Sequence, residues 1–204
     1  MNILITGSAG FIGYHLSKKL LSLGHDVQGI DNINDYYDIS NKDMRISALR
    51  KFRNFNFIKD DINNINETGL GAYDLVINLA AQAGVRLSKK QYFKYDHSNV
   101  NGFKKVLNFC ANKGIKKLIF ASSSSVYGNQ DSKKLSENLI PNPISYYGET
   151  KLLNETYAQD YAKKFDIDSL GLRFFTVYGR YGRPDMAYYL FSKNLIQNKN
   201  IKLN

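Results

Sequence analysis

Short apolar runs alternate along this chain with longer segments whose apolar residues recur at helical spacing. The short runs predict β-strands at residues 2–6, 26–30, 55–59, 75–79, 117–121 and 169–174. The clearest helical patterns cover residues 13–23, 93–112 and 146–164. Strands that alternate with helices are typical of a parallel sheet covered on both faces. The pattern therefore predicts an α/β fold, a doubly wound parallel sheet, in which ligands bind beyond the carboxyl ends of the strands.

The composition is that of an ordinary globular domain. The chain has 204 residues, of which 43% are hydrophobic and 23% are charged. No apolar run approaches the roughly 18 residues of a membrane span. Met1 leads directly into the first predicted strand without the layout of a signal peptide. We therefore expect a cytoplasmic protein with no membrane partner.

The distribution of charge argues against a nucleic-acid-binding protein, and the distribution of histidines argues against a metal-binding protein. The net charge of +10 could indicate nucleic acid, but the lysine doublets are scattered along the chain, as on a solvated surface. His15, His25 and His97 lie far apart in sequence, with no cysteine or carboxylate at ligand spacing. We expect no nucleic-acid partner and no metal site.

The segment from Met1 to Gly13 carries the first candidate chemistry. Its Thr6-Gly7-Ser8-Ala9-Gly10-Phe11-Ile12-Gly13 sequence follows an apolar run and precedes a helical pattern. The three glycines permit a tight turn and close approach of the backbone to an anion, and the N–H groups at the helix start would face a pyrophosphate. A structural glycine turn is the alternative, but the strand–turn–helix context favours a Rossmann-type dinucleotide site.

Asp31, at the end of the second predicted strand, indicates which dinucleotide is bound. It follows Gly13 by 18 residues, close to the spacing of about 20 expected for a carboxylate that binds a ribose 2′-hydroxyl. The charge of Asp31 would repel a 2′-phosphate, and Asn32 is not the arginine that would accommodate one. The sequence therefore favours NAD, with an ordinary loop aspartate as the alternative.

Candidate catalytic side chains follow the fifth predicted strand. Four hydroxyls, Ser122 to Ser125, stand at its carboxyl end, and Tyr147 and Lys151 share one face of a helical pattern. A neighbouring ammonium lowers the pKa of a tyrosine from its ordinary value of about 10 toward that of a useful general base. Such spacing is often coincidental, but the nucleotide-binding pattern makes this pair a catalytic candidate.

These motifs resemble the extended short-chain dehydrogenases/reductases, in the family of NAD-dependent sugar-nucleotide epimerases and dehydratases. The resemblance rests on the glycine spacing, on the Tyr147-x-x-x-Lys151 pair and on Ser123 before Val126-Tyr127-Gly128, and it covers essentially the whole chain. It implies that Ser123, Tyr147 and Lys151 are catalytic. The residues that it implies for NAD binding are Gly7, Gly10, Phe11, Ile12, Gly13, Asp31, Asn32, Asp61, Ile62, Ala80, Ala81, Asn99, Tyr147, Lys151 and Val177.

Within this family, three segments are similar to the UDP-glucuronate epimerases: residues 32–38 with Arg45, residues 80–86 and residues 182–187. Related 4,6-dehydratases have an Asp-Glu pair after the catalytic hydroxyl, where this chain has Ser124 and Ser125, so the acid and base that eliminate water are missing. The resemblance implies a UDP-sugar, epimerised at C4 by transient oxidation and re-reduction with NAD. The residues implied for substrate binding are Arg86, Ser124, Ser125, Thr176 and Arg183.

The resemblance also predicts a domain organisation. Residues 1–178 are expected to form the NAD-binding domain, and residues 179–204 the beginning of a C-terminally truncated substrate domain. An inactive NAD-binding fragment is therefore one alternative, and a UDP-galactose-type 4-epimerase or a UDP-glucuronate 5-epimerase is another. The helices expected over residues 99–112 and 147–164 would form a homodimer through a four-helix contact.

Overall fold

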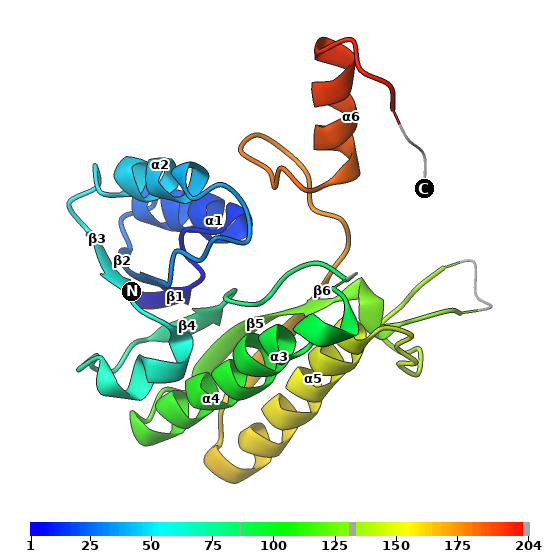
Figure 1. Cartoon of the computed structure of the whole chain (residues 1–204). Helices are drawn as coiled ribbons and strands as arrows, with labels where there is room; N and C mark the ends of the chain where they lie inside the picture. The colour runs from blue at the N-terminus through cyan, green and yellow to red at the C-terminus, as the bar shows by residue number, and fades with distance from the viewer. Residues whose placement is uncertain (86, 131–133, 202–204) are drawn as a thin grey trace.

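The computed structural model describes residues 1–85, 87–130 and 134–201 (Figure 1). Its sheet has six strands in the order β3-β2-β1-β4-β5-β6, and every neighbouring pair is parallel. This is the Rossmann order, so the predicted fold class is confirmed, and each predicted strand is found to within two residues. The strands are β1 (Asn2–Thr6), β2 (Asp26–Asp31), β3 (Phe55–Lys59), β4 (Leu75–Asn78), β5 (Lys117–Ser123) and β6 (Asp168–Phe174).

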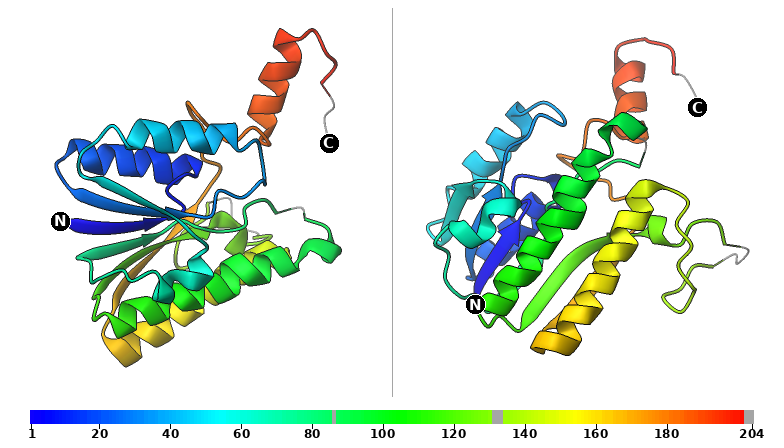
Figure 2. Two further views of the ribbon diagram at one scale, coloured as in Figure 1. Left: turned by 60° about the vertical axis from the view of Figure 1, so that its left-hand side comes forward. Right: turned by 60° about the horizontal axis from the view of Figure 1, so that its bottom comes forward.

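Helices cover both faces of the sheet (Figure 2). On one face lie α1 (Phe11–Ser22) and α2 (Ser40–Leu49), and on the other lie α4 (Phe103–Asn112) and α5 (Tyr146–Phe165). A last helix, α6 (Ala187–Ile196), stands away from the sheet (Figure 1). It falls within the segment predicted to begin a substrate domain, and that domain division remains a prediction. The short helical segments are η1 (Ile62–Glu67), η2 (Lys89–Gln91), α3 (Phe93–Tyr95), η3 (Asp96–Gly102) and η4 (Ser124–Val126).

The long helix expected over residues 93–112 is interrupted. Its middle part, η3, is a π-helix, flanked by α3 and α4. Gly102 closes this stretch, where a Cβ atom would lie 2.4 Å from Cδ1 of Ile62. π-Helical turns occur frequently at functional sites, and η3 contains Asn99, one of the predicted cofactor residues.

Two apolar cores hold the helices to the sheet. One lies under α4 and α5 and includes Leu107, Phe109 and Phe120. The other lies under α1 and α2 and includes Ile3 and Ile5 of β1. Because helices cover both faces of the sheet, a ligand is expected to bind beyond the carboxyl ends of the strands. Within the part of the chain that the structure describes, no helix is long and apolar enough to cross a membrane.

Candidate active site

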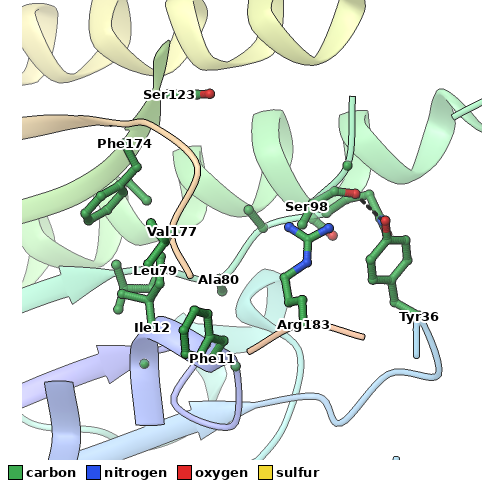
Figure 3. A pocket seen from close by; sticks show the side chains of 18 of the residues that line it. Phe11, Ile12, Tyr36, Leu79, Ala80, Ser98, Ser123, Phe174, Val177 and Arg183 are labelled. Atoms are coloured by element: carbon green, nitrogen blue, oxygen red, sulfur yellow. Dashed lines mark hydrogen bonds between the residues drawn. The ribbon is translucent and has the colours of Figure 1, made fainter. Parts of the chain in front are cut away.

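A pocket of about 380 Å³ lies at the carboxyl ends of the strands, a volume suited to a cofactor or small molecule. In Figure 3, Phe11, Ile12 and Val177 lie on one side of it, and Arg183 reaches into it beside Ser98. The predicted site residues that line it are Gly7, Gly10, Phe11, Ile12, Gly13, Asp31, Asn32, Asp61, Ile62, Ala80, Ala81, Ser123, Ser124, Ser125, Tyr147, Lys151, Thr176, Val177 and Arg183.

The glycine turn between β1 and α1 leaves no room for side chains. Gly7 has a φ of 72°, and a Cβ atom there would lie 2.7 Å from the backbone nitrogen of Ala80 on the neighbouring strand end. A Cβ atom on Gly13 would lie 2.1 Å from the carbonyl oxygen of Gly7. The first glycine therefore permits the turn, and the last permits α1 to pack directly on it.

The start of α1 presents unpaired backbone donors to the pocket. No side chain in the described residues caps this end, whose N-cap is Gly10, and its first turn holds no acidic residue. A helix N-terminus combines free N–H groups with the positive end of the helix dipole. The turn thus has the open cradle and the donors that a pyrophosphate needs.

Asp31 lies at the edge of this cradle, buried at 7% exposure. Its carboxylate accepts hydrogen bonds from the backbone nitrogens of Ala9 (3.2 Å) and Ile33 (2.9 Å), and Lys42 Nζ lies 3.9 Å away. Burial raises the pKa of this carboxyl, while Lys42 and the two backbone donors oppose the rise. Asp31 is therefore fixed in orientation before any ligand binds.

Asp61 lies beyond the end of β3 and is tied to Asn32. One carboxylate oxygen accepts from the Asn32 side chain at 2.8 Å, and the other accepts from the backbone nitrogen of Asn63 at 2.9 Å. Burial acts to raise the pKa of Asp61, but these hydrogen bonds outweigh it and lower the pKa. Two predicted cofactor residues from different strand ends are thus held together.

Asn99 and Arg86 differ from the other predicted residues. Asn99 does not line the pocket: its side chain accepts from the backbone nitrogen of Gln82 at 2.8 Å and donates to the Gln82 carbonyl and to Thr150. Asn99 therefore holds the loop after β4 in place through hydrogen bonds to its backbone. Arg86 lies outside the described residues.

Ser123 and Tyr147 both line the pocket. Ser123, the last residue of β5, also caps η4, since its Oγ accepts from the Ser125 nitrogen at 3.1 Å. Burial raises the pKa of the Tyr147 phenol, whereas a hydrogen bond from Ser123 and the charge of Arg183 lower it. Burial is the larger effect, so the pKa of Tyr147 is raised and not lowered as the sequence predicted, and the groups that oppose the rise are Ser123 and Arg183 rather than Lys151.

Lys151 is the second member of the tyrosine–lysine pair. It is 2% exposed, its Nζ donates to the Ala121 carbonyl at 2.8 Å, and Nζ lies 5.9 Å from the centre of the Tyr147 ring. Burial lowers the pKa of Lys151 to about 8. A positive charge on Lys151 is consequently sensitive to pH near neutrality.

This burial predicts a pH-dependent stability. The native pKa of about 8 lies below the ordinary value of 10.5, so the unfolded chain binds more protons between these values and stability rises with pH there. Relative to Lys151→Met, the wild type should gain about 3 kcal/mol of unfolding free energy between pH 8 and pH 10.5. Urea unfolding of both proteins without ligand measures this, and a difference that is constant with pH would contradict it.

The helix that carries Tyr147 and Lys151 is fixed to the sheet by Glu155. Glu155 accepts from Arg173 of β6 through two bonds of 2.9 and 2.8 Å, and from Ser122 of β5 at 2.5 Å. Glu155 stands one helical turn beyond Lys151. This network sets the distance between α5 and the strand that ends in Ser123.

The chain after β6 brings Thr176 and Arg183 into the pocket. Arg183 forms a two-bond ion pair with Asp185, at 3.0 and 2.5 Å, and Tyr36 donates to Asp185 at 3.1 Å. Tyr36 and Lys42 also line the pocket, and no sequence motif indicated either of them as a site residue. Their position after the carboxyl end of β2 was the available signal.

Comparison with known proteins gives one consistent result. A family model described as the NAD dependent epimerase/dehydratase family matches residues 3–204. Protein CapI of Staphylococcus aureus is 46% identical over 206 residues, which are 98% of this chain and 61% of that protein. UDP-glucuronate 4-epimerase 4 of Arabidopsis thaliana is 40% identical over 209 residues, which are 100% of this chain and 48% of that protein.

Solved structures agree with these sequence matches. The crystal structure of UDP-glucuronic acid 4-epimerase from Bacillus cereus, in complex with UDP-glucuronic acid and NAD, matches with a TM-score of 0.89 and 38% identity. The match covers 98% of this chain and 64% of that one. The chain thus spans about three fifths of the length of CapI and about half of the Arabidopsis protein.

Proposed function

Since this chain belongs to the NAD-dependent epimerase/dehydratase family, we propose that it binds NAD and epimerises a nucleotide sugar, UDP-glucuronate, at C4. The observation that carries the proposal is that Ser123, Tyr147 and Lys151 line the same pocket as the open glycine turn. Similarity to proteins named UDP-glucuronate 4-epimerase, at 40% and 38% identity, supports the choice of substrate.

The cofactor site fits NAD in three places. The start of α1, with Gly7 and Gly13 clearing the approach, would hold the pyrophosphate. Asp31 would accept hydrogen bonds from a ribose at the end of β2. Lys151, near the end of β5, would bind the second ribose, and Val177 would lie beside the nicotinamide.

The chemistry assigned to the chain is proton transfer at the sugar 4-hydroxyl. NAD, when bound, supplies reversible hydride transfer. Tyr147, as phenolate, takes the hydroxyl proton while C4 loses its hydride, and Ser123 donates a hydrogen bond to the same oxygen. The resulting 4-keto sugar turns over, and return of hydride and proton to the opposite face inverts C4 without net oxidation.

A glucuronate substrate makes the 4-keto sugar a β-keto acid, which loses CO₂ when its carboxylate aligns with the carbonyl. Groups that hold the carboxylate in another orientation are therefore needed. Ser124, Ser125 and Thr176 offer hydroxyls at the pocket wall, and Arg183 offers a charge. Arg86 is a further candidate.

Incubation with UDP-glucuronate and NAD, followed by chromatography for UDP-galacturonate, tests the proposal. Parallel incubations with UDP-galactose, and analysis for C5 inversion, test the two related epimerases. Formation of UDP-galacturonate supports the proposed reaction. Binding of NAD without turnover of any of these sugars would instead support an NAD-binding module.

Asp31 should determine the preference for NAD over NADP. Asp31→Asn keeps the shape but removes the charge, and we expect the ratio of NADP to NAD dissociation constants to fall by about tenfold. Lys42, 3.9 Å from Asp31, would then be free to attract a 2′-phosphate. Titration of both cofactors measures the ratio. Asp26→Asn, at the exposed other end of β2, is the matched control, and an unchanged ratio in Asp31→Asn would refute this role.

We also propose a homodimer through α4 and α5. These helices lie side by side on one face of the sheet (Figure 2), and Leu153 of α5 is 39% exposed there. Light scattering coupled to size exclusion tests this, with Leu153→Glu expected to shift the protein toward the monomer.

A further inference from the structure

We propose that Arg45 is a positioning residue that ties the glycine turn of the cofactor site to residues 179–185, and thereby sets Arg183 in the pocket. The proposal deepens the function proposed above, since it assigns a residue that connects the cofactor side to the substrate side. The two sides are far apart in sequence, but Arg45 contacts both.

Arg45 is buried and donates hydrogen bonds to three segments of the chain. This side chain on α2 is 1% exposed. Its Nη1 donates to the carbonyl of Ala9, within the glycine turn, at 2.9 Å, and to the Tyr37 hydroxyl at 2.7 Å. Its Nη2 donates to the carbonyl of Tyr181 at 2.8 Å. One planar guanidinium therefore fixes three segments relative to one another.

The backbone at Tyr181 needs such support. Its φ of 60° lies in the left-handed region, which disfavours residues with a side chain by about 1–2 kcal/mol. Strained residues persist where their surroundings hold them. Besides the bond from Arg45, the Tyr181 ring packs edge-on against Tyr14 at 5.8 Å, and the carbonyl of Arg180 lies 2.8 Å from His15 Nε2.

Arg183 follows this turn by two residues. It enters the pocket near Ser98 (Figure 3) and pairs with Asp185. Asp185 in turn accepts from Tyr36, the neighbour of Tyr37. Arg45 therefore fixes the chain on both sides of Arg183: through Tyr181 directly, and through the loop that carries Tyr36 and Tyr37.

The chemistry of the residue favours positioning over simple stability. A buried charge is expensive to desolvate, so a guanidinium kept at this position is expected to supply something that an apolar side chain cannot. Among the residues that the structure describes, Arg45 has no carboxylate within ion-pair distance. What the guanidinium supplies is a fixed set of donors aimed at carbonyls of different segments.

Hydrogen exchange of the full chain, with and without NAD, tests this inference in wild type, Arg45→Met, Arg45→Lys and Arg50→Met. In Arg45→Met we expect amides of residues 178–185 to exchange about tenfold faster than in wild type. NAD should slow their exchange in wild type but not in Arg45→Met. Arg45→Lys should restore part of the effect, because one ammonium cannot reach all three acceptors. Arg50→Met, near the end of the same helix, should match wild type.

Turnover with UDP-glucuronate gives a second measurement. Misplacement of Arg183 should raise KM about tenfold in Arg45→Met, with a smaller change in kcat. Exchange in residues 178–185 that equals wild type, with and without NAD, would overturn the inference. If Arg45→Met does not fold, the same criterion applies to Arg45→Lys. Exchange without ligand stays decisive if no sugar turns over, so this inference and the proposed function can fail separately.

Discussion

Tyr147→Phe should lose epimerisation while retaining NAD. The substitution removes only the phenolic oxygen, which is the assigned proton acceptor and lies in the pocket that Ser123 also lines. Loss of a general base lowers kcat by about 10³-fold. The pyrophosphate site at the start of α1 is untouched, so the dissociation constant of NAD should change by less than about threefold. Turnover assays and cofactor titration on the same preparation measure both quantities.

The adjacent tyrosine provides the control. Tyr146 stacks on Tyr92 and donates to Asp96, and it does not line the pocket. Tyr146→Phe also removes one phenolic oxygen, but kcat should stay within about threefold of wild type. Equal loss in both variants, or undiminished turnover in Tyr147→Phe, would remove Tyr147 from its assigned role.

Gly13→Ala should abolish NAD binding. The new methyl group would lie 2.1 Å from the Gly7 carbonyl oxygen and 2.9 Å from the Ser8 Cα, and these backbone atoms cannot rotate away. Helix α1 must move off the turn, so its N–H groups leave the pyrophosphate position. We expect an affinity loss of at least about 100-fold and a fall of about 2 kcal/mol in unfolding free energy. Cofactor titration and urea unfolding measure these effects.

Gly71→Ala is the matched control for the added methyl group. A Cβ atom at Gly71 meets no heavy atom within 4 Å, and its φ is not positive. Its stability should stay within about 0.5 kcal/mol of wild type, and its NAD affinity should not change. Retention of wild-type NAD affinity by Gly13→Ala would show that the turn is not the cofactor cradle.

Most of the sheet was predictable because buried parallel strands are continuous apolar runs. The site followed for a related reason, since a parallel sheet gathers the residues after each strand at one edge. Asp31, Asp61 and Ser123 each stand at or just after the end of a strand, and all three line the pocket although they are distant in sequence. This arrangement of the strand ends predicts the pocket but not the side-chain orientations within it.

Helix α2, which the hydrophobic pattern did not predict, buries both charged and apolar side chains. Helix α2 buries Lys42 and Arg45 along with Ile46 and Leu49, so its inner face lacks the apolar stripe by which helices are predicted. The contact of Arg45 with Tyr181 spans 136 residues and has no local signal. The position of Asn99 below the loop after β4 could not be predicted either: it lies in the π-helical segment η3, and its side chain accepts from the backbone nitrogen of Gln82.

The position of β1 has a consequence for the order of assembly. β1 precedes β2 to β6 along the chain, yet it lies inside the sheet, between β2 and β4. The glycine turn after β1 contacts both neighbouring strands. Gly7 donates to the carbonyl of Ile30 in β2 at 2.8 Å, and it packs against the backbone of Ala80, just after β4. A nascent chain that ends before β4 lacks half of the backbone partners of β1. The glycine turn lies within residues 1–13, but its backbone contacts are complete only once the chain has been made as far as Ala80.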